Sequence, residues 1–314
     1  MPRKLSAGLF AALLLITIVF TGLHFDGFNS FISGGDEAVE IAAEGAWLYV
    51  GIILAFAIEI AGLTFSLTGK MEKAAAPEIM FPPLSKRVIA ATVVILLAIP
   101  VTMYIGSYFL GDRKYYFISL LIILETMLPF ALVFERRKPQ AREIIIIAVL
   151  CAIAVAGRAA FFMLPQFKPV VAIVVISGVA FGGEAGFLVG AMTGFVSNMF
   201  FGQGPWTPWQ MFAFGVIGFL AGILFRKGFL RRSPATLAVF GALATVVIYG
   251  PIMDASMVVL YQTHINRSML LAALLQGAPF NLVHAAATVI FLVIISRPML
   301  EKLDRIKLKY GLIE

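Results

Sequence analysis

The sequence predicts an all-α polytopic membrane protein. Of its 314 residues, 61% are hydrophobic and only 13% are charged, whereas a soluble domain has about half apolar and about a quarter charged residues. The mean hydropathy is +0.98. Apolar runs near the length that crosses a bilayer core recur along the whole chain. We therefore expect about ten transmembrane helices.

The expected helices begin next to the N-terminus. The first apolar run follows Arg3 and Lys4, and we interpret it as a retained helix because no convincing A-x-A cleavage site follows it. The run at 169–182 is short for a span, so we expect it to be tilted or broken. In chain order, the runs lie near residues 6–24, 47–68, 87–110, 115–134, 143–164, 169–182, 184–201, 209–225, 235–260 and 269–296.

Basic residues are distributed unevenly between the two sides of the predicted bundle. If the N-terminus is cytoplasmic, most of the 24 lysine and arginine residues fall on inner segments, with clusters at 136–142, 226–232 and 297–309. The positive-inside rule requires this asymmetry. It predicts a multi-pass protein of the cell membrane with both termini in the cytoplasm. The net charge of +7 then reflects membrane orientation, and nucleic-acid binding is not predicted.

The chain divides at the polar stretch "FERRKPQAR", residues 134–142. Residues 1–140 are expected to form a four-helix membrane region of unknown role with an acidic outer loop. Residues 141–314 are expected to form a six-helix module that carries the whole net positive charge. Glu59 and Glu125 lie mid-membrane in the first region. They are open to interpretation as paired polar groups, proton carriers or an extra interface.

Two stripes of small residues recur at four-residue spacing, which places each stripe on one helix face. The first consists of Ala148, Ala152, Ala156 and Ala160, and the second of Gly182, Gly186, Gly190 and Gly194. Faces without side-chain bulk let another helix approach closely in lipid. Each stripe is therefore either an internal packing face or a docking face for another subunit.

The segment "FFGQGPWTPWQM", residues 200–211, lies between two apolar runs on the predicted outer side. Its two prolines each fix a backbone angle, and its glycines permit close backbone approach. One interpretation makes Trp206 and Trp209 anchors in the membrane interface. The other makes them a stiff aromatic lid over a flat ligand with polar edges.

Polar side chains gather toward the outer side of the six-helix module. Such groups are costly at membrane depth and usually face a cavity or a partner. Each one alone is also explained by an interhelical hydrogen bond, but together they predict a substrate site. The predicted substrate-binding residues are Trp206, Trp209, Asn198, Gln203, Arg158, Asp254, His264, Gln276, Asn281 and His284.

Residues 142–310 resemble the substrate-binding S component of energy-coupling factor (ECF) vitamin transporters. The resemblance depends on the alanine-striped first helix of the module, the loop "MLPQFKPVVA", and the block "SGVAFGGEAGFLVGAMTGFVSNMFFGQGPWTPWQMFAFGVIGFLAGILFR". It implies a six-helix bundle with an outward-facing pocket that binds a micronutrient. The four N-terminal helices lie outside it.

The resemblance also implies partners. An S component has no ATPase of its own and docks on a membrane T component that carries two ABC-type ATPases. It is thought to topple in the membrane to release its cargo. The family's docking face carries over to Ala148, Ala152 and Ala156 and, less closely, to Gly186 and Gly190. In agreement, the chain has no G-x-x-x-x-G-K-[ST] loop for ATP phosphates.

Three functions compete at this point. The first is the binding subunit of a vitamin importer, with no catalytic residues and no cofactor. The second is a proton-coupled secondary transporter using Glu59, Glu125 or Asp254. The third is a membrane enzyme, but the sequence contains no H-E-x-x-H or G-x-S-x-G motif. With Cys151 as the one cysteine, a thiolate metal site is also excluded. The first candidate for the ligand is cobalamin or a precursor of it. Riboflavin, thiamine precursors and queuosine precursors are the alternative candidates.

Overall fold

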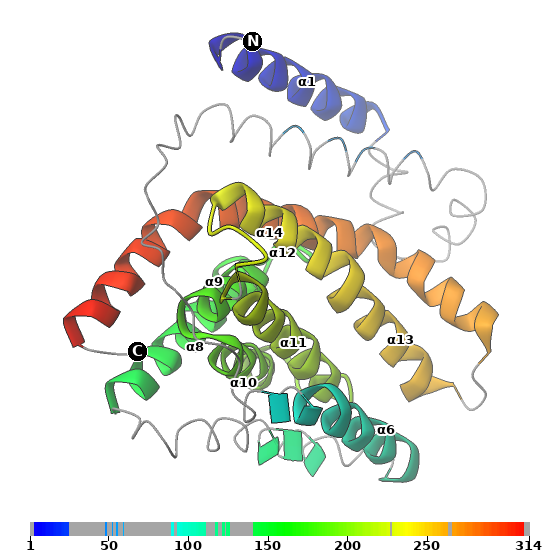
Figure 1. Ribbon diagram of the computed structural model, residues 1–314. Helices are drawn as coiled ribbons and strands as arrows, with labels where there is room; N and C mark the ends of the chain where they lie inside the picture. The colour runs from blue at the N-terminus through cyan, green and yellow to red at the C-terminus, as the bar shows by residue number, and fades with distance from the viewer. Residues whose placement is uncertain are drawn as a thin grey trace.

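The fold is described from a computed structural model. It describes residues 3–24, 89–90, 93–110, 117–118, 121–122, 124–125, 141–226, 228–262 and 266–310, together with residues 48, 52, 55 and 59. Within these residues every regular element is a helix (Figure 1). Four helical segments are long and apolar enough to cross a membrane, namely Ala141–Ala160, Thr207–Arg226, Pro234–Tyr261 and Arg267–Tyr310. The predicted class of all-α membrane protein is confirmed.

The second region contains the helical runs that the sequence predicts for it. Its penultimate run, Pro234–Tyr261, is divided by a π-helical turn, η3, and its last run extends farther than expected, to Tyr310. The elements are α8 (Ala141–Ala160), α9 (Val170–Phe181), α10 (Gly183–Phe201), α11 (Thr207–Arg226), α12 (Pro234–Ala244), η3 (Thr245–Tyr249), α13 (Gly250–Tyr261) and α14 (Arg267–Tyr310).

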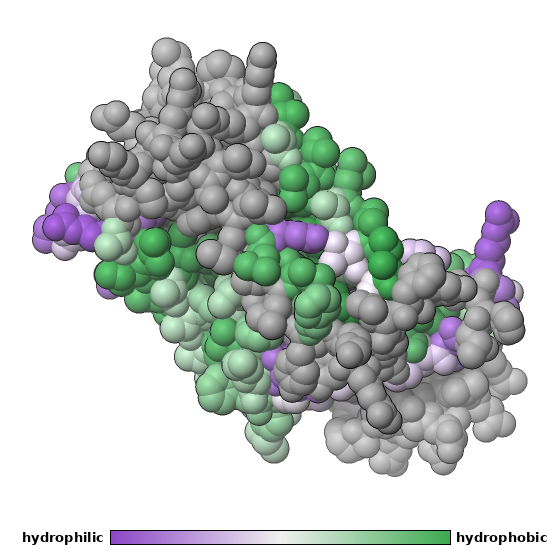
Figure 2. Space-filling model, turned by 90° about the horizontal axis from the view of Figure 1, so that it is seen from below, coloured by the Kyte–Doolittle hydropathy of each residue, from purple (hydrophilic) through white to green (hydrophobic). Residues whose placement is uncertain are grey.

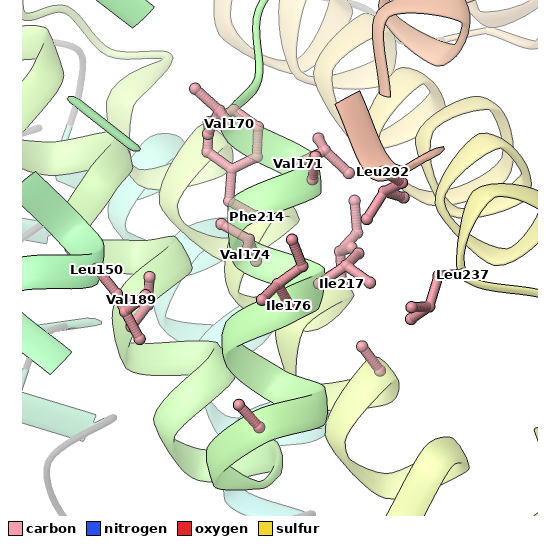
Figure 3. Packing of buried hydrophobic residues seen from close by; sticks show 14 of the residues in the cluster. Leu150, Val170, Val171, Val174, Ile176, Val189, Phe214, Ile217, Leu237 and Leu292 are labelled. Atoms are coloured by element: carbon pink, nitrogen blue, oxygen red, sulfur yellow. The ribbon is translucent and has the colours of Figure 1, made fainter. Parts of the chain in front are cut away.

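Helix α9 is the centre of this bundle. Nearly all of its residues are buried, and it contacts α8, α10, α11, α12 and α14. A helix that is hydrophobic all round belongs in a core, and 12 residues rise only about 18 Å, less than a bilayer core. Figure 3 shows Val174 and Ile176 among side chains from the surrounding helices. The short run therefore fills the interior, and it ends at Gly182, whose φ is 97°.

Helices α9, α10 and α11 pack closely because glycines face each other across them. A Cβ atom on Gly186 would collide with the carbonyl oxygen of Gly218, and one on Gly218 would collide with the backbone of Gly186. A Cβ atom on Gly190 would lie 2.5 Å from the carbonyl carbon of Phe214. Gly178 also meets Gly218. Most of the glycine stripe is thus an internal packing face filled by α11.

The N-terminal region contributes α1 (Arg3–Leu23), η1 (Val94–Ala98) and α6 (Ile99–Leu110) to the described structure. Most of the runs predicted at 47–68 and 115–134 lie outside the described residues, so the count of ten helices stays a prediction. Two threonines bond glutamates of this region: Thr17 Oγ1 donates to Glu59 Oε1 at 2.7 Å, and Thr102 Oγ1 donates to Glu125 Oε1 at 2.5 Å.

The third predicted helix packs against the six-helix module. Buried side chains of η1 and α6, together with Ile118 and Ile122, form one hydrophobic cluster with side chains of α10 and α11, and we call it the second cluster. Its members are Ile95, Ile99, Met103, Ile118, Ile122, Phe187, Ala191, Met211, Val216 and Phe219. This face of the module is therefore covered by the chain's own N-terminal region.

Hydrophobic side chains also lie on the surface. On the face shown in Figure 2, hydrophobic residues cover most of the described surface, and hydrophilic residues gather mainly at its left and right edges. Helix α8, for example, exposes the side chains of Ile144, Ile145, Val149 and Ile153. Water would disfavour so much exposed apolar area, whereas lipid does not. The surface is that of a membrane-embedded bundle.

Candidate functional site

A buried polar cluster lies at the end of the bundle where α8 and α10 finish and α11 begins. At its centre, Nη1 of Arg158 donates to Ser197 Oγ at 2.5 Å, to Asn198 Oδ1 at 2.8 Å and to Gln210 Oε1 at 3.5 Å. Arg158 is in the last turn of α8, and its three partners come from two other helices. One guanidinium thus ties three helix ends together.

The cluster extends through two further hydrogen bonds. Gln210 Nε2 donates to the hydroxyl of Tyr249 at 3.0 Å, and Asn198 Nδ2 donates to Thr207 Oγ1 at 3.1 Å. Thr207 Oγ1 also accepts from the backbone N–H of Gly204 at 3.2 Å. The loop before α11 is therefore held against the polar cluster. We define this cluster as Arg158, Ser197, Asn198, Thr207, Gln210 and Tyr249.

Three rings form an aromatic wall beside the polar cluster. The ring centroids of Phe214 and Tyr249 are 4.8 Å apart in a stacked arrangement, and the ring of His284 stands edge-on to Tyr249, also at 4.8 Å. Tyr249 ends the π-helical turn η3, a feature found frequently at functional sites. His284 is 2% exposed, and neither ring nitrogen has a hydrogen-bond partner among the described residues. A buried, unpaired imidazole indicates a ligand site.

Arg158 retains unused bonding capacity. Its Nε and Nη2 atoms form no hydrogen bond with the described residues, and none of their carboxylates pairs with it. Its guanidinium lies 5.3 Å from the ring centroid of Phe201. Nearby, Lys168 Nζ donates to the carbonyls of Phe161, Phe162 and Leu164. Partial desolvation and the charge of Arg158 lower the pKa of Lys168. The two basic side chains together make this end of the site electropositive.

A second polar pair joins α13 to α14. Asn281 Nδ2 donates to Asp254 Oδ2 at 2.8 Å. Glycines make room for the pair: a Cβ atom on Gly250 would collide with the Asn281 amide, and one on Gly277 would collide with the Asp254 carboxylate. Asn281 lies one turn before His284 on α14. The pair therefore adjoins the aromatic wall.

The structure places the predicted substrate-binding residues in different environments. It brings Arg158 and Asn198 together, and it places His284 beside Tyr249 and Asp254 beside Asn281. Gln276 is exposed on α14, and His264 lies outside the described residues.

The predicted site residues of the tryptophan loop, Gln203, Trp206 and Trp209, also lie in different environments. Gln203 Nε2 donates to the carbonyl of Phe195 at 2.9 Å. The ring of Trp206 covers Gly204, so a Cβ atom there would collide with it. Trp209 is already inside α11 and packs against the second cluster. The free loop is therefore shorter than the sequence motif, and its two tryptophans face different surroundings.

Several residues of the site were not among those predicted from sequence. Gln210 lies within the quoted motif "GPWTPWQM", one position after Trp209. Because successive residues of a helix are rotated by about 100°, the side chains of Trp209 and Gln210 point in different directions. Ser197 precedes a predicted residue. Tyr249 and Phe214 carry no sequence signal that separates them from other apolar positions. Only the packing of α11 against η3 and α13 assigns them to the site.

An apolar groove runs between α8 and α10 on the surface of the bundle. Its volume is about 1020 Å³. Ala148, Ala152 and Ala156 are exposed and form part of its wall. The full lining is Ile144, Ile147, Ala148, Cys151, Ala152, Val155, Ala156, Ala159, Leu188, Met192, Val196, Phe200 and Phe201.

The two glycines predicted for the docking face lie elsewhere. Gly186 and Gly190 are buried and contact α11 within this chain. This differs from the expectation that they belong to a docking face, because the glycine stripe is already occupied. The groove surface considered below leaves them out.

These features define a helical membrane protein with a polar and aromatic site at one end of its bundle. A family model described as "ECF-type riboflavin transporter, S component" matches residues 138–302. The chain therefore belongs to the S components of ECF transporters, which are substrate-binding transporter subunits rather than an enzyme family. Membership implies a T component and ATPase module as partners. Comparison with curated proteins and with solved structures gave no match.

Proposed function

We propose that this S component captures a flat heteroaromatic vitamin from the outer face of the cell membrane and delivers it to an ECF-type ABC importer. The observation that carries the proposal is the buried His284 beside Tyr249. Among the described residues its ring nitrogens have no hydrogen-bond partner, and Nε and Nη2 of the nearby Arg158 have none either. A planar ring suits the aromatic wall, and acceptor atoms on the ring edge suit Arg158. Riboflavin is the first candidate because the matching family model is described by it.

We assign different roles to the two tryptophans, Trp206 and Trp209. We assign Trp206 to the cover of the ligand, with Asn198 and Gln203 on the polar edge. Trp209 instead anchors the start of α11 in the second cluster. Because Trp209 holds this turn of α11 in place, the next side chain, Gln210, is oriented toward Tyr249 and Arg158.

The groove between α8 and α10 is the proposed docking site for the T component. Its lining is almost entirely apolar and includes Ala148, Ala152 and Ala156, whose small side chains would let a partner helix approach the backbone closely. The two ATPases of the energy-coupling module would then drive release of the vitamin into the cytoplasm. The other side of the module is already covered by η1 and α6.

The membrane topology belongs to the same proposal. Ten spans with both termini in the cytoplasm put the tryptophan loop and His264 outside. In this topology residues 1–140 form a four-helix membrane region, of which η1 and α6 pack against the second module. Cysteine at Gln203 should then react with an impermeant reagent added outside, whereas cysteine at Met71 or Gly228 should not. Labelling of position 228 from outside would overturn the ten-span topology.

Ligand binding by the purified protein tests the proposed function. Native mass spectrometry first identifies what co-purifies, and isothermal calorimetry then compares riboflavin, cobalamin and thiamine. We expect riboflavin binding that Arg158→Met weakens about tenfold to a hundredfold, because a bond to a charged donor contributes about 1.5–3 kcal/mol. The matched control is Arg267→Met, an exposed arginine in the first turn of α14.

Two results would contradict the proposal. Equal losses in both variants would mean that Arg158 has no direct contact with the ligand. Tight binding of cobalamin and none of riboflavin would replace the proposed ligand. Uptake in proteoliposomes separates the mechanisms, since an importer subunit needs ATP and its partners. Uptake driven by a proton gradient alone would instead favour a secondary transporter.

A further inference from the structure

Helix α14 is longer than a membrane span needs. Its 44 residues rise about 66 Å, whereas the hydrocarbon core of a bilayer is about 30 Å thick. Its last part, residues 297–310, contains five basic and two acidic side chains, and we call it the C-terminal extension. Leu300 and Leu303 of this extension are buried in the core cluster that also contains α9. The extension is therefore an amphipathic helix that packs on the end of the bundle.

The exposed side of the C-terminal extension is basic. Lys302, Arg305 and Lys309 are exposed, and none of them forms an ion pair with the described residues. Their spacing of three and four residues places them on one helix face. At about 100° per residue they span about 60°, on the side away from Leu300 and Leu303. The three cations thus form one stripe that faces away from the bundle.

The acidic side chains of the extension pair with other basic residues. Glu301 Oε1 lies 3.0 Å from Nε of Arg297. Asp304 lies 3.2 Å from Nη2 of Arg232 and 3.4 Å from Nζ of Lys307. The three cations of the stripe therefore remain in excess of the carboxylates that the extension itself supplies.

A further cation joins the stripe from another helix. The guanidinium carbon of Arg142, in the first turn of α8, lies 5.1 Å from the ring centroid of Tyr310. Nζ of Lys309 lies 5.4 Å from the same centroid. The end of α14 and the beginning of α8 thus meet at this ring (Figure 1). Two like charges held against one ring repel each other, and an anion bound beside them would offset that repulsion.

The surface of α8 gives the depth of these cations in the membrane. Arg142, Ile145 and Val149 follow each other on one face of α8, and the two apolar side chains are 59% and 49% exposed. An exposed apolar face of this kind belongs among acyl chains. Arg142 lies one turn beyond it, about 4.5 Å along the axis. This is the level of the lipid headgroups, where tyrosines such as Tyr310 are also enriched.

We propose that these side chains form a binding surface for the headgroups of anionic phospholipids. Guanidinium and ammonium groups donate strong hydrogen bonds to phosphate, and basic segments beside membrane spans are attracted to anionic leaflets. Lipid is the occupant that the apolar surroundings favour, because acyl chains already cover the adjoining face of α8. The surface lies at the bundle end opposite the polar cluster, since Arg158 is in the last turn of α8. It is independent of the vitamin that binds there. Its members are Arg142, Lys302, Arg305, Lys309 and Tyr310.

Native mass spectrometry of the full chain in detergent tests the lipid surface. Phosphatidylglycerol and phosphatidylcholine with identical acyl chains are titrated separately, and their dissociation constants are compared. We expect the wild type to prefer phosphatidylglycerol at least about tenfold. Arg142→Gln should weaken phosphatidylglycerol about fivefold, and the triple variant Lys302→Gln, Arg305→Gln, Lys309→Gln about a hundredfold. The matched control is Arg267→Gln, an exposed arginine in the first turn of α14, which should change neither affinity.

Three outcomes would overturn the lipid surface. The first is equal affinity of the wild type for the two lipids. The second is an equal loss of phosphatidylglycerol in Arg142→Gln and Arg267→Gln, which would show general charge attraction without a defined surface. The third is unchanged lipid affinity in the triple variant, and poorer recovery with the T component and ATPases would then assign the stripe to an acidic protein surface. If the triple variant does not elute as folded protein, the comparison of Arg142→Gln with Arg267→Gln decides alone.

Discussion

The stripes on α8 and α10 have the same four-residue spacing and opposite surroundings. The alanines at 148, 152 and 156 are exposed along an apolar groove. The glycines at 186, 190 and 194 are buried against α11. Both stripes permit close helix approach, but within the described part of the chain only the glycine stripe is covered by another helix. The four-residue spacing of small residues therefore identifies a face suited to helix packing, but it does not identify the helix that covers that face.

The energetic reason lies in how closely each face is approached. At the glycine stripe the neighbour is backbone, which cannot rotate away from an added side chain. The alanine stripe lines an open groove of the described structure, so atoms added there meet no other side chain in this part of the chain. Substitutions should therefore affect folding at one stripe and assembly at the other.

Gly190→Leu should have the largest effect. Even a Cβ atom would lie 2.5 Å from the Phe214 carbonyl carbon, and overpacking by whole side chains costs about 1–3 kcal/mol or more. We expect no monodisperse folded protein in detergent by size-exclusion chromatography. Ala148→Leu is the matched control and should elute like the wild type. A well-folded Gly190→Leu variant would show that α10 and α11 separate more easily than their packing indicates.

The two tryptophans extend the comparison to a pair of identical side chains. Trp209→Ala removes a ring packed on the second cluster, so we expect the melting temperature to fall, with a cost of about 3 kcal/mol. Trp206→Ala should instead lower riboflavin affinity by one to two orders of magnitude, about 1–3 kcal/mol, at an unchanged melting temperature. Calorimetry and thermal unfolding together check both. Unchanged affinity in the Trp206 variant would remove the lid role.

Ala152→Leu tests the open stripe. The added atoms fill part of the groove, and we expect recovery of the protein with a co-expressed T component and its ATPases to fall about tenfold. Riboflavin affinity of the isolated protein should stay the same. The matched control is Val149→Leu, which adds a methylene on an exposed face of α8 outside the groove. Normal complex recovery for both variants would mean that the partner docks elsewhere.

Gly194→Ala should have the smallest effect. A Cβ atom there lies 3.2 Å from the backbone of Met211, so α11 must shift by only a few tenths of an ångström. The strain of about 1 kcal/mol is offset by the helix preference of alanine over glycine, also about 1 kcal/mol. Thermal unfolding should differ little from the wild type. A loss of folding would indicate that the glycine stripe is equally tight along its whole length.

Much of the fold follows from local sequence. Apolar runs predict the helices of the second module because a backbone in lipid must satisfy its own hydrogen bonds. The break at Gly182 between α9 and α10 is visible as two adjoining runs. The site is only partly predictable. Asn198, Asp254 and His284 are conspicuous as polar residues in apolar surroundings, whereas Phe214 and Tyr249 are not.

By itself the sequence determined the membrane class, the positions of the helices in the second region and the family of the module, because hydropathy and motif spacing are local properties. Tertiary structure decided the rest. It placed α9 in the core, filled the glycine stripe with α11 and left the alanine stripe open. It also brought Arg158, Gln210 and Tyr249 into one polar cluster. The physical reason is that contacts between helices distant in sequence depend on which faces meet, and many pairings of apolar faces bury similar area.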